Sequence, residues 1–480
     1  MHFASMGLSA LIALAPLGAG AADLSQVGPQ AGAAQIAAAH GPAQEPALKL
    51  VFTVDDNISP PHPMTVESAP GFLYVEESGH GTLYDYRIRR VIGLDSTRHV
   101  FTNSSLYALV DFYAAETASR RFERGALGAV KAPDQTVLLD PFWVQSELRI
   151  VDPDDPPASI DQSKTASGAF YFSSHNKPAA SYVLSSQPLA VGDRRGFARL
   201  LRMRAAIHPR IADTLVASGM LPQRLSYVMP PVMKKPDVTW TLQSADHVTA
   251  DYPLTADYSA EPLPPDSKDA IVQSLRALLP VMLAATSGSA GHRPRGIADY
   301  QAAIDGALRA RKPFQAVLLS LELTLQYGAQ ADCPTVVRNS CHSSKEVFAV
   351  AAKDRRTQDL KRSLQSPPAQ LDFAIKLLRG LKRDDVKNGY VIDDFLANDL
   401  VAAGHGDQAL PLFLGAIKGN PYLAGYYKDL GDLFRRSFQP DLAWLCYDLG
   451  RTLPGGAGAP VISDVNGFEQ NLSEKYPEFF

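Results

Sequence analysis

Two consecutive segments near the C-terminal end of the chain share one residue pattern at an offset of 34 positions. They cover residues 390–421 and 424–455. Small residues fall at equivalent positions, Ala397 with Gly431 and Ala409 with Ala443. Large apolar residues also fall at equivalent positions, Leu396 with Leu430, Leu400 with Phe434 and Phe413 with Tyr447. Each copy is therefore predicted to form two antiparallel helices, because small residues allow close approach and large ones fill the surrounding space.

The period of 34 and this arrangement of small and large residues resemble the tetratricopeptide repeat family over about residues 390–455. The first copy departs from the family pattern at Asp393, where a large residue is usual, whereas Tyr427 fits in the second copy. Such stacks normally need at least three units. Residues 298–328 are a candidate for a further, degenerate unit, with Ala316 at the close-contact position.

The resemblance also implies where a partner would bind, because one face of each first helix lines the groove of a tetratricopeptide stack. The corresponding positions are Asp394, Asn398 and Val401 in the first copy, and Lys428, Asp432 and Arg435 in the second. Their polar groups could hold an acidic side chain or a C-terminal carboxylate by charge-assisted hydrogen bonds. The alternative is an ordinary solvated helix face, and the sequence leaves both open.

Residues 47–251 have a different sequence pattern, with short runs in which polar and apolar residues alternate. Examples are "GFLYVEE", "AFYFSS", "ASYVLSS" and "VTWTLQS", and residues 81–94 are predicted as one continuous strand. Helices are expected from Asn103 onward and again over 196–219, broken at Pro209. Because the strands are not each followed by a helix, we predict an α+β domain with an antiparallel sheet.

The domain organisation follows from these changes in composition. Residues 252–268 are rich in Pro and polar residues and are predicted to be a linker. Residues 269–480 are predicted to form an all-α domain of helical hairpins similar to tetratricopeptide repeats. Residues 23–46 are rich in Ala, Gly, Gln and Pro without apolar periodicity, and are predicted to be a flexible spacer.

The first 22 residues indicate export. The stretch "GLSALIALAPLGAGAA" carries no charge, and its apolar run is too short to span a bilayer comfortably. Small residues at Ala19 and Ala21 suit cleavage by a signal peptidase near Ala21 or Ala22. We therefore predict a signal peptide over residues 1–22, a periplasmic or secreted protein, and no stable insertion into a membrane. A buried N-terminal helix is the alternative.

The chain has 3 cysteines. Cys333 and Cys341 flank the segment "PTVVRNS", which can turn, and an oxidising compartment favours a disulfide between them over two free thiols. Cys446 lies in the apolar segment "AWLCYDL" and is predicted to be a small buried residue. The cysteine and histidine spacings match no metal-binding motif, so neither a metal site nor a cofactor is predicted.

Two functions remain open from the sequence. The first is a non-catalytic exported adaptor that binds a protein or peptide through its helical domain. The second is an envelope hydrolase or transferase with its active site in the α+β domain and the repeats recruiting substrate. The sequence contains neither a nucleophile elbow nor an HExxH motif, which favours the adaptor. A net charge of −4 argues against nucleic acid as the partner.

Overall fold

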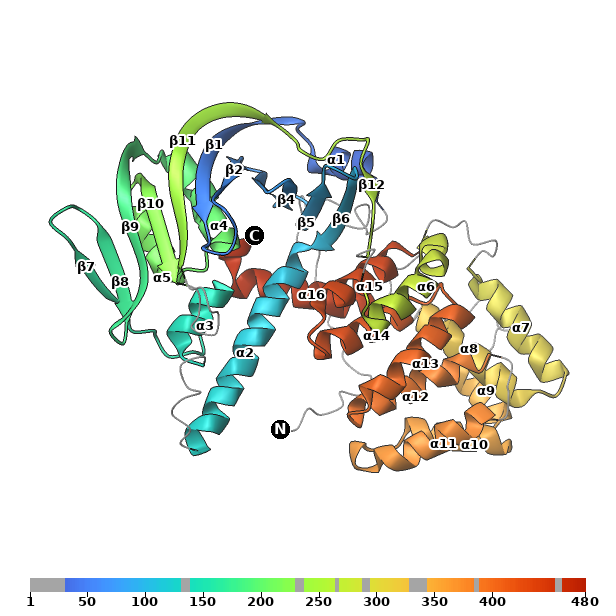
Figure 1. Cartoon of the computed structure of the whole chain (residues 1–480). Coiled ribbons are helices and arrows are strands. Elements are labelled where there is room, and N and C mark those ends of the chain that lie inside the picture. Colours follow the sequence, from blue (N-terminus) through green and yellow to red (C-terminus); the bar gives the residue numbers. More distant parts are fainter. Residues whose placement is uncertain are drawn as a thin grey trace. The chain divides into compact units, whose positions relative to one another are not determined.

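The structure is a computed structural model of the chain (Figure 1), and it describes residues 31–130, 139–228, 237–263, 267–286, 294–327, 343–383, 388–453 and 460–480. Its contacts divide it into two compact units. The sheet unit comprises the described residues of Pro29–Pro265 with Phe438–Trp444 and Phe468–Phe480. The helical unit comprises the described residues of Asp266–Ser437 and Leu445–Gly467.

The sheet unit is built on one sheet of 12 described strands in the order β12-β6-β5-β4-β3-β2-β1-β11-β10-β9-β8-β7. Neighbouring strands are antiparallel, except that β12 runs parallel to β6. The strands are β1 Gln44–Asp55, β2 His62–Ser68, β3 Phe72–Glu77, β4 His80–Asp85, β5 Arg90–Asp95, β6 Val100–Ser105, β7 Asp161–Lys164, β8 Phe170–Ser174, β9 Lys177–Pro188, β10 Met220–Val228, β11 Asp237–Asp251 and β12 Ser259–Ala260.

Five described helices accompany the sheet: α1 Ala33–His40, α2 Leu106–Val130, α3 Pro141–Leu148, α4 Arg194–Arg204 and α5 Pro209–Ala217. Helix α4 packs on β2 and β3, and α5 packs on β10. Alternate residues of each strand point to opposite faces. Large side chains such as Phe172, Tyr182, Leu225 and Trp240 are buried on one face and form the core.

The helical unit contains α6 Ala270–Thr286, α7 Ile297–Arg309, α8 Pro313–Tyr327, α9 Ser344–Val350, α10 Arg355–Leu364, α11 Leu371–Arg383, α12 Tyr390–Ala402, α13 Gly406–Gly419 and α14 Ala424–Arg436, with parts of α15 Pro440–Thr452 and α16 Pro460–Lys475. Consecutive helices pair, as α7 does with α8, α10 with α11 and α12 with α13. The predicted fold class is confirmed: an α+β part with a mostly antiparallel sheet is followed by an all-helical part of paired helices.

The helix boundaries reproduce the 34-residue offset of the sequence. Helix α14 begins 34 residues after α12, at 424 against 390, and α15 begins 34 residues after α13, at 440 against 406. The matched small and large residues of both copies are all buried. Asp393, which departs from the repeat pattern, forms an ion pair across two helices, its Oδ1 lying 2.7 Å from Lys382 Nζ of α11.

The predicted flexible spacer over 23–46 is wrong for its described part from residue 33 onward. Helix α1 begins at Ala33, and β1 begins at Gln44. His40 is fully buried between two carboxylates, with Nδ1 2.8 Å from Asp85 Oδ2 and Nε2 2.8 Å from Glu45 Oε1. Ala33 and Ile36 are buried on the same helix, so this short segment is anchored by two apolar residues together with the buried His40.

The predicted linker over 252–268 is also packed against the sheet unit over much of its length. Tyr252, Leu254 and Leu263 are buried, and the Tyr252 hydroxyl donates a 2.7 Å hydrogen bond to Asp85 Oδ2. Strand β12 extends the sheet from within this segment. The boundary between the two units falls at residues 265 and 266, inside the predicted range.

Several local predictions can be compared with the structure. Helices α4 and α5 are separated before Pro209, as expected, and His175 and Asn176 adopt positive φ in the turn between β8 and β9. The predicted strand over 81–94 is two strands, β4 and β5, joined by a hairpin turn. The helix expected from Asn103 begins at Leu106, because residues 100–105 pair with β5 instead.

Two predictions fall outside the described residues. The signal peptide over 1–22 precedes residue 31, where the described part begins. Cys333 and Cys341 lie within 328–342, another range outside it, so their disulfide stays a prediction. Cys446 is a buried free cysteine, as expected, and its burial raises the pKa of the thiol.

Candidate functional site

Several of the residues predicted to line a partner groove form hydrogen bonds or ion pairs within the helical unit. Asp394 is buried, with 3% of its surface exposed, whereas Asn398 is exposed and donates a 2.8 Å hydrogen bond to Asp429 Oδ2 on α14. Lys428 Nζ lies 2.9 Å from Asp432 Oδ2. Asn398 of α12 therefore contacts α14 through Asp429, which is not a predicted position, whereas Lys428 and Asp432 pair within α14.

The remaining groups of this face are also engaged within the helical unit. Asp432 Oδ1 accepts a 2.7 Å hydrogen bond from the Tyr447 hydroxyl, and Lys428 Nζ lies 3.7 Å from Asp464 Oδ2. Arg435 is partly buried. A ligand at this face would have to compete with contacts that already exist, and the binding role of these residues stays a prediction.

Two carboxyl groups of this region have raised pKa values. Burial raises the pKa of Asp394 well above its usual range, and the nearby Asp429 and Asp393 raise it further. Burial also raises the pKa of Asp429 to about 6, although the hydrogen bond from Asn398 acts in the opposite direction. Among the described residues, none forms a hydrogen bond with Asp394 Oδ1. The surroundings of Asp394 and Asp429 therefore favour the protonated, neutral form of these carboxyl groups.

A different carboxylate, Glu322 of α8, is the centre of a buried polar network. Its Oε1 accepts hydrogen bonds from the hydroxyls of Tyr300 at 2.9 Å and Tyr390 at 2.8 Å, and from Asn420 Nδ2 at 2.5 Å. Its Oε2 accepts a 3.3 Å hydrogen bond from Asn388 Nδ2. Four donors from separate segments, around α7, α12 and the end of α13, therefore meet one carboxylate.

The network has clear electrostatic consequences. The side chain of Glu322 is 0% exposed, so hydrogen bonds must replace the water that an ionised carboxylate would otherwise hold. Burial first, and then the adjacent charge of Glu322, raises the pKa values of Tyr300 and Tyr390. Both phenols therefore remain protonated donors at neutral pH.

A cavity of about 490 Å³ opens beside this network. Its polar lining is Arg295, Glu322, Tyr390, Lys418 and Asn420. Its other lining residues, contributed by α6 and by the end of α13, are Pro280, Val281, Ala284, Gly419, Pro421 and Tyr422. The cavity thus combines a fully hydrogen-bonded acid, two cationic side chains and an apolar wall.

The two cations are positioned differently. Arg295 NH1 lies 4.0 Å from Glu322 Oε2, and its guanidinium carbon is 5.6 Å from the ring centroid of Tyr300. The Tyr327 hydroxyl donates a 2.6 Å hydrogen bond to the Arg295 carbonyl and fixes the backbone there. Lys418 is exposed near the end of α13. An anion entering the cavity would meet both side chains.

This site was not among those predicted from the sequence. Its residues are spread from 280 to 422, and the contacts exist only in the folded unit. One signal was present: Glu322 is the only charged residue in the apolar segment "FQAVLLSLELTLQYG". A lone carboxylate on the buried side of a helix needs hydrogen-bond partners, and the chain supplies them.

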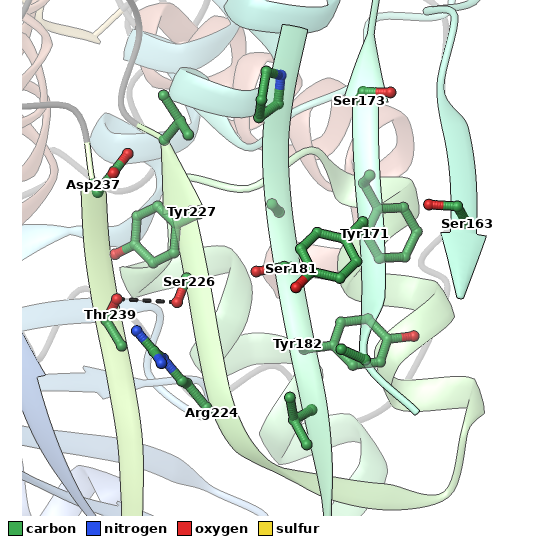
Figure 2. Close-up of a pocket in the computed structure, with 16 residues that line it drawn as sticks. Ser163, Tyr171, Ser173, Ser181, Tyr182, Arg224, Ser226, Tyr227, Asp237 and Thr239 are labelled. Carbon is green, nitrogen blue, oxygen red and sulfur yellow. Dashed lines mark hydrogen bonds between the residues drawn. The ribbon is translucent and has the colours of Figure 1, made fainter. Parts of the chain in front are cut away.

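A second hollow, of about 480 Å³, lies in the sheet unit over strands β7 to β11. Figure 2 shows its labelled side chains, which include Ser163, Tyr171, Ser181, Ser226 and Thr239. Ser226 and Thr239 share a hydrogen bond of 3.0 Å between their hydroxyls. The hollow is therefore a hydroxyl-rich surface, unlike the charged cavity of the helical unit.

A serine and a histidine meet at the turn between β8 and β9. Ser174 Oγ lies 3.3 Å from His175 Nδ1, and Asp140 Oδ2 lies 3.4 Å from the same nitrogen. In a Ser–His–Asp triad the hydroxyl and the carboxylate contact opposite ring nitrogens. This arrangement is therefore not that of a nucleophile activated by a general base. Within the described ranges, no group of three His, Cys, Asp or Glu residues could hold a metal ion.

Comparison with known proteins gives no further assignment. Among the described helices, none combines the length and the apolar character needed to span a membrane. No family model, curated protein or solved structure matches the chain.

Proposed function

We propose that the chain is an exported, non-catalytic adaptor whose helical unit holds an acidic segment of a protein partner in the cavity beside Glu322. One observation carries this proposal: Arg295 and Lys418 line a cavity whose single carboxylate already accepts four hydrogen bonds. Arg295 contacts Glu322 only at 4.0 Å and its side chain is 44% exposed, and Lys418 is exposed, so both cations have donors available to a ligand. Arg and Lys pair with carboxylates through charge-assisted hydrogen bonds, which are stronger than neutral ones.

The apolar wall supports a peptide rather than a free inorganic anion. Pro280, Val281 and Ala284 of α6 face the same cavity as the two cations. A ligand that combines a carboxylate with a neighbouring apolar side chain satisfies both parts of the lining. The stacked helical hairpins, and their resemblance to tetratricopeptide repeats, favour a protein partner over a small metabolite.

The proposal is tested with a peptide array on the full chain. Ten-residue peptides that mix Asp or Glu with apolar residues are compared with the same peptides carrying Asn or Gln instead. The wild type should prefer the acidic peptides, and higher salt should weaken binding because the cations are partly exposed to solvent. Replacing both Arg295→Glu and Lys418→Glu should lower the affinity by about a hundredfold, since each lost charged hydrogen bond costs roughly a factor of ten.

A matched control uses Lys376→Glu on α11, an exposed lysine that is not part of the cavity lining. It should leave peptide binding unchanged and, as an isolated surface charge, should melt close to the wild type. Arg295→Glu adds a carboxylate beside the buried Glu322, so the double variant should melt lower and is assayed below its melting temperature. The proposal would be rejected if the wild type bound the Asp or Glu peptides and the Asn or Gln peptides equally well. Unchanged peptide affinity in the folded double variant would also reject it.

A further inference from the structure

The hollow of the sheet unit is organised as a row of hydroxyl-bearing residues that crosses five strands. Each member of the row is the register partner of the next, from Ser163 to Tyr171, Ser181, Ser226 and Thr239. Because register partners lie side by side on the same face of a sheet, these side chains form one continuous line. At the usual spacing between strands, the line is about 19 Å long.

The row is accessible to a ligand. Tyr171 is 49% exposed although it is a large aromatic residue, and Val183 beside the row is 38% exposed. In Figure 2 the labelled Tyr171 ring lies over the neighbouring strand near Ser181, its register partner. The alternate residues of the same strands, such as Tyr182 and Leu225, are buried on the opposite face. One face therefore forms the core, and the other presents hydroxyls and an aromatic ring.

The charges of the hollow cancel. Arg224 and Asp237 lie on either side of the row, each two residues from a row member on the same strand (Figure 2). Hydroxyls donate and accept hydrogen bonds without adding charge. A ligand that suits this surface is neutral, has many hydroxyl groups, and offers a C–H face to an aromatic ring.

We propose that this row binds a neutral oligosaccharide lying across strands β7 to β11. A sugar ring packs its C–H groups on Tyr171, while its hydroxyls exchange hydrogen bonds with Ser181, Ser226 and Thr239. Arg224 and Asp237 bind further hydroxyl groups at the two sides. This site shares no lining residue with the charged cavity proposed to bind a peptide. Carbohydrate binding can therefore be tested whether or not the chain binds a peptide.

Other classes of ligand fit the surface less well. A nucleic acid strand needs several cations along its phosphates. A peptide that extends a sheet binds to backbone groups at an edge strand, whereas most of this row is contributed by the interior strands β8 to β11. The chemistry of the row therefore selects a carbohydrate.

The test is calorimetric titration of the full chain with three neutral hexasaccharides: maltohexaose, cellohexaose and chitohexaose. Saturable binding of at least one is expected. Tyr171→Ala should weaken it by about tenfold through the loss of the aromatic contact. Tyr171→Phe keeps the ring and should retain most of the affinity. The control variant Phe122→Ala removes an aromatic side chain that is 79% exposed on α2, away from the hollow, and should bind as the wild type does.

The proposal is overturned by any of three results. They are a folded wild type that binds none of the three hexasaccharides, a Tyr171→Ala variant with wild-type affinity, and tighter binding of a single-stranded oligothymidine than of any hexasaccharide. The variant carrying Arg295→Glu and Lys418→Glu should still bind the hexasaccharide. That result separates this proposal from the peptide-binding function.

Discussion

Buried charged residues of the chain fall into two groups according to their partners. His40 contacts carboxylates with both ring nitrogens, and Glu322 receives four hydrogen bonds, so both are compensated within the fold. Asp394 instead has one oxygen with no hydrogen-bond partner in the described part of the chain, and it lies near two other carboxyl groups, Asp429 and Asp393. Compensated groups stabilise the fold, whereas Asp394 is a source of pH sensitivity in the repeat region.

We expect Asp394→Asn to stabilise the protein at neutral and alkaline pH. The folded state of the wild type keeps protons that the unfolded state releases, because the pKa of Asp429 is raised from 3.8 to about 6 and that of Asp394 is also raised well above its usual range. The free energy of unfolding therefore falls as pH rises through this window, because the folded state binds more protons there. Asn cannot ionise, so the free energy of unfolding of the variant should fall less than that of the wild type as pH rises.

The measurement is the melting temperature of both proteins across a pH series. At about pH 8 the variant should melt a few degrees higher, and below about pH 3, where Asp394 is protonated in both the folded and the unfolded state, the difference should vanish. Asp372→Asn on the exposed start of α11 is the control and should follow the wild type. A variant less stable than the wild type at pH 8 would show that Asp394 is ionised and satisfied.

At the scale of elements, the end of α13 approaches the start of α12 closely. A Cβ atom added at Gly419 would lie 2.5 Å from Tyr390 Cγ, closer than real contacts allow. Tyr390 in turn donates to Glu322 and lines the cavity. The absence of a side chain at Gly419 thus sets the position of a cavity residue.

Gly419→Ala should therefore displace Tyr390, destabilise the protein by about 1–3 kcal/mol, and weaken binding of the acidic peptide. The higher helix propensity of Ala offsets at most about 1 kcal/mol of this cost. Gly467→Ala in α16 is the matched control, since nothing lies within 4 Å of its added Cβ. Denaturant unfolding should show the control at or above wild-type stability. Wild-type behaviour of Gly419→Ala would mean that Tyr390 can move without cost.

The elements that could be predicted from the sequence are those set by local pattern. The boundaries of α12 to α15 follow the 34-residue offset, because small and large residues recur at fixed helical positions. Residues 103–105 were expected to begin a helix, yet they pair with β5, because strand pairing overrides a local capping preference. The Glu322 network could not be predicted from local pattern, because Tyr300 and Asn420 are 120 residues apart. Contacts between residues so far apart in the chain produce no periodic pattern in the sequence.

For the whole molecule, the two candidate sites differ in charge and belong to different units. The helical cavity has a cationic excess, whereas the sheet hollow is neutral, and the chain carries a net charge of only −4. A partner protein and a carbohydrate would thus be recognised by separate parts of one chain. Such a function suits an exported protein, which is the proposal that the apolar, uncharged stretch within residues 1–22 supports.

Export makes a prediction about both the N-terminus and the cysteines. Protein recovered from outside the cytoplasm should begin at Ala22 or Asp23, and a peptide map made without reductant should show Cys333 linked to Cys341. The bridge closes a short loop, so its removal by Cys333→Ser should cost about 2–3 kcal/mol. Cys446 is buried, with a raised thiol pKa, and should react with an alkylating agent only after unfolding. An intact Met1 together with free thiols at 333 and 341 in the recovered protein would contradict export through this route.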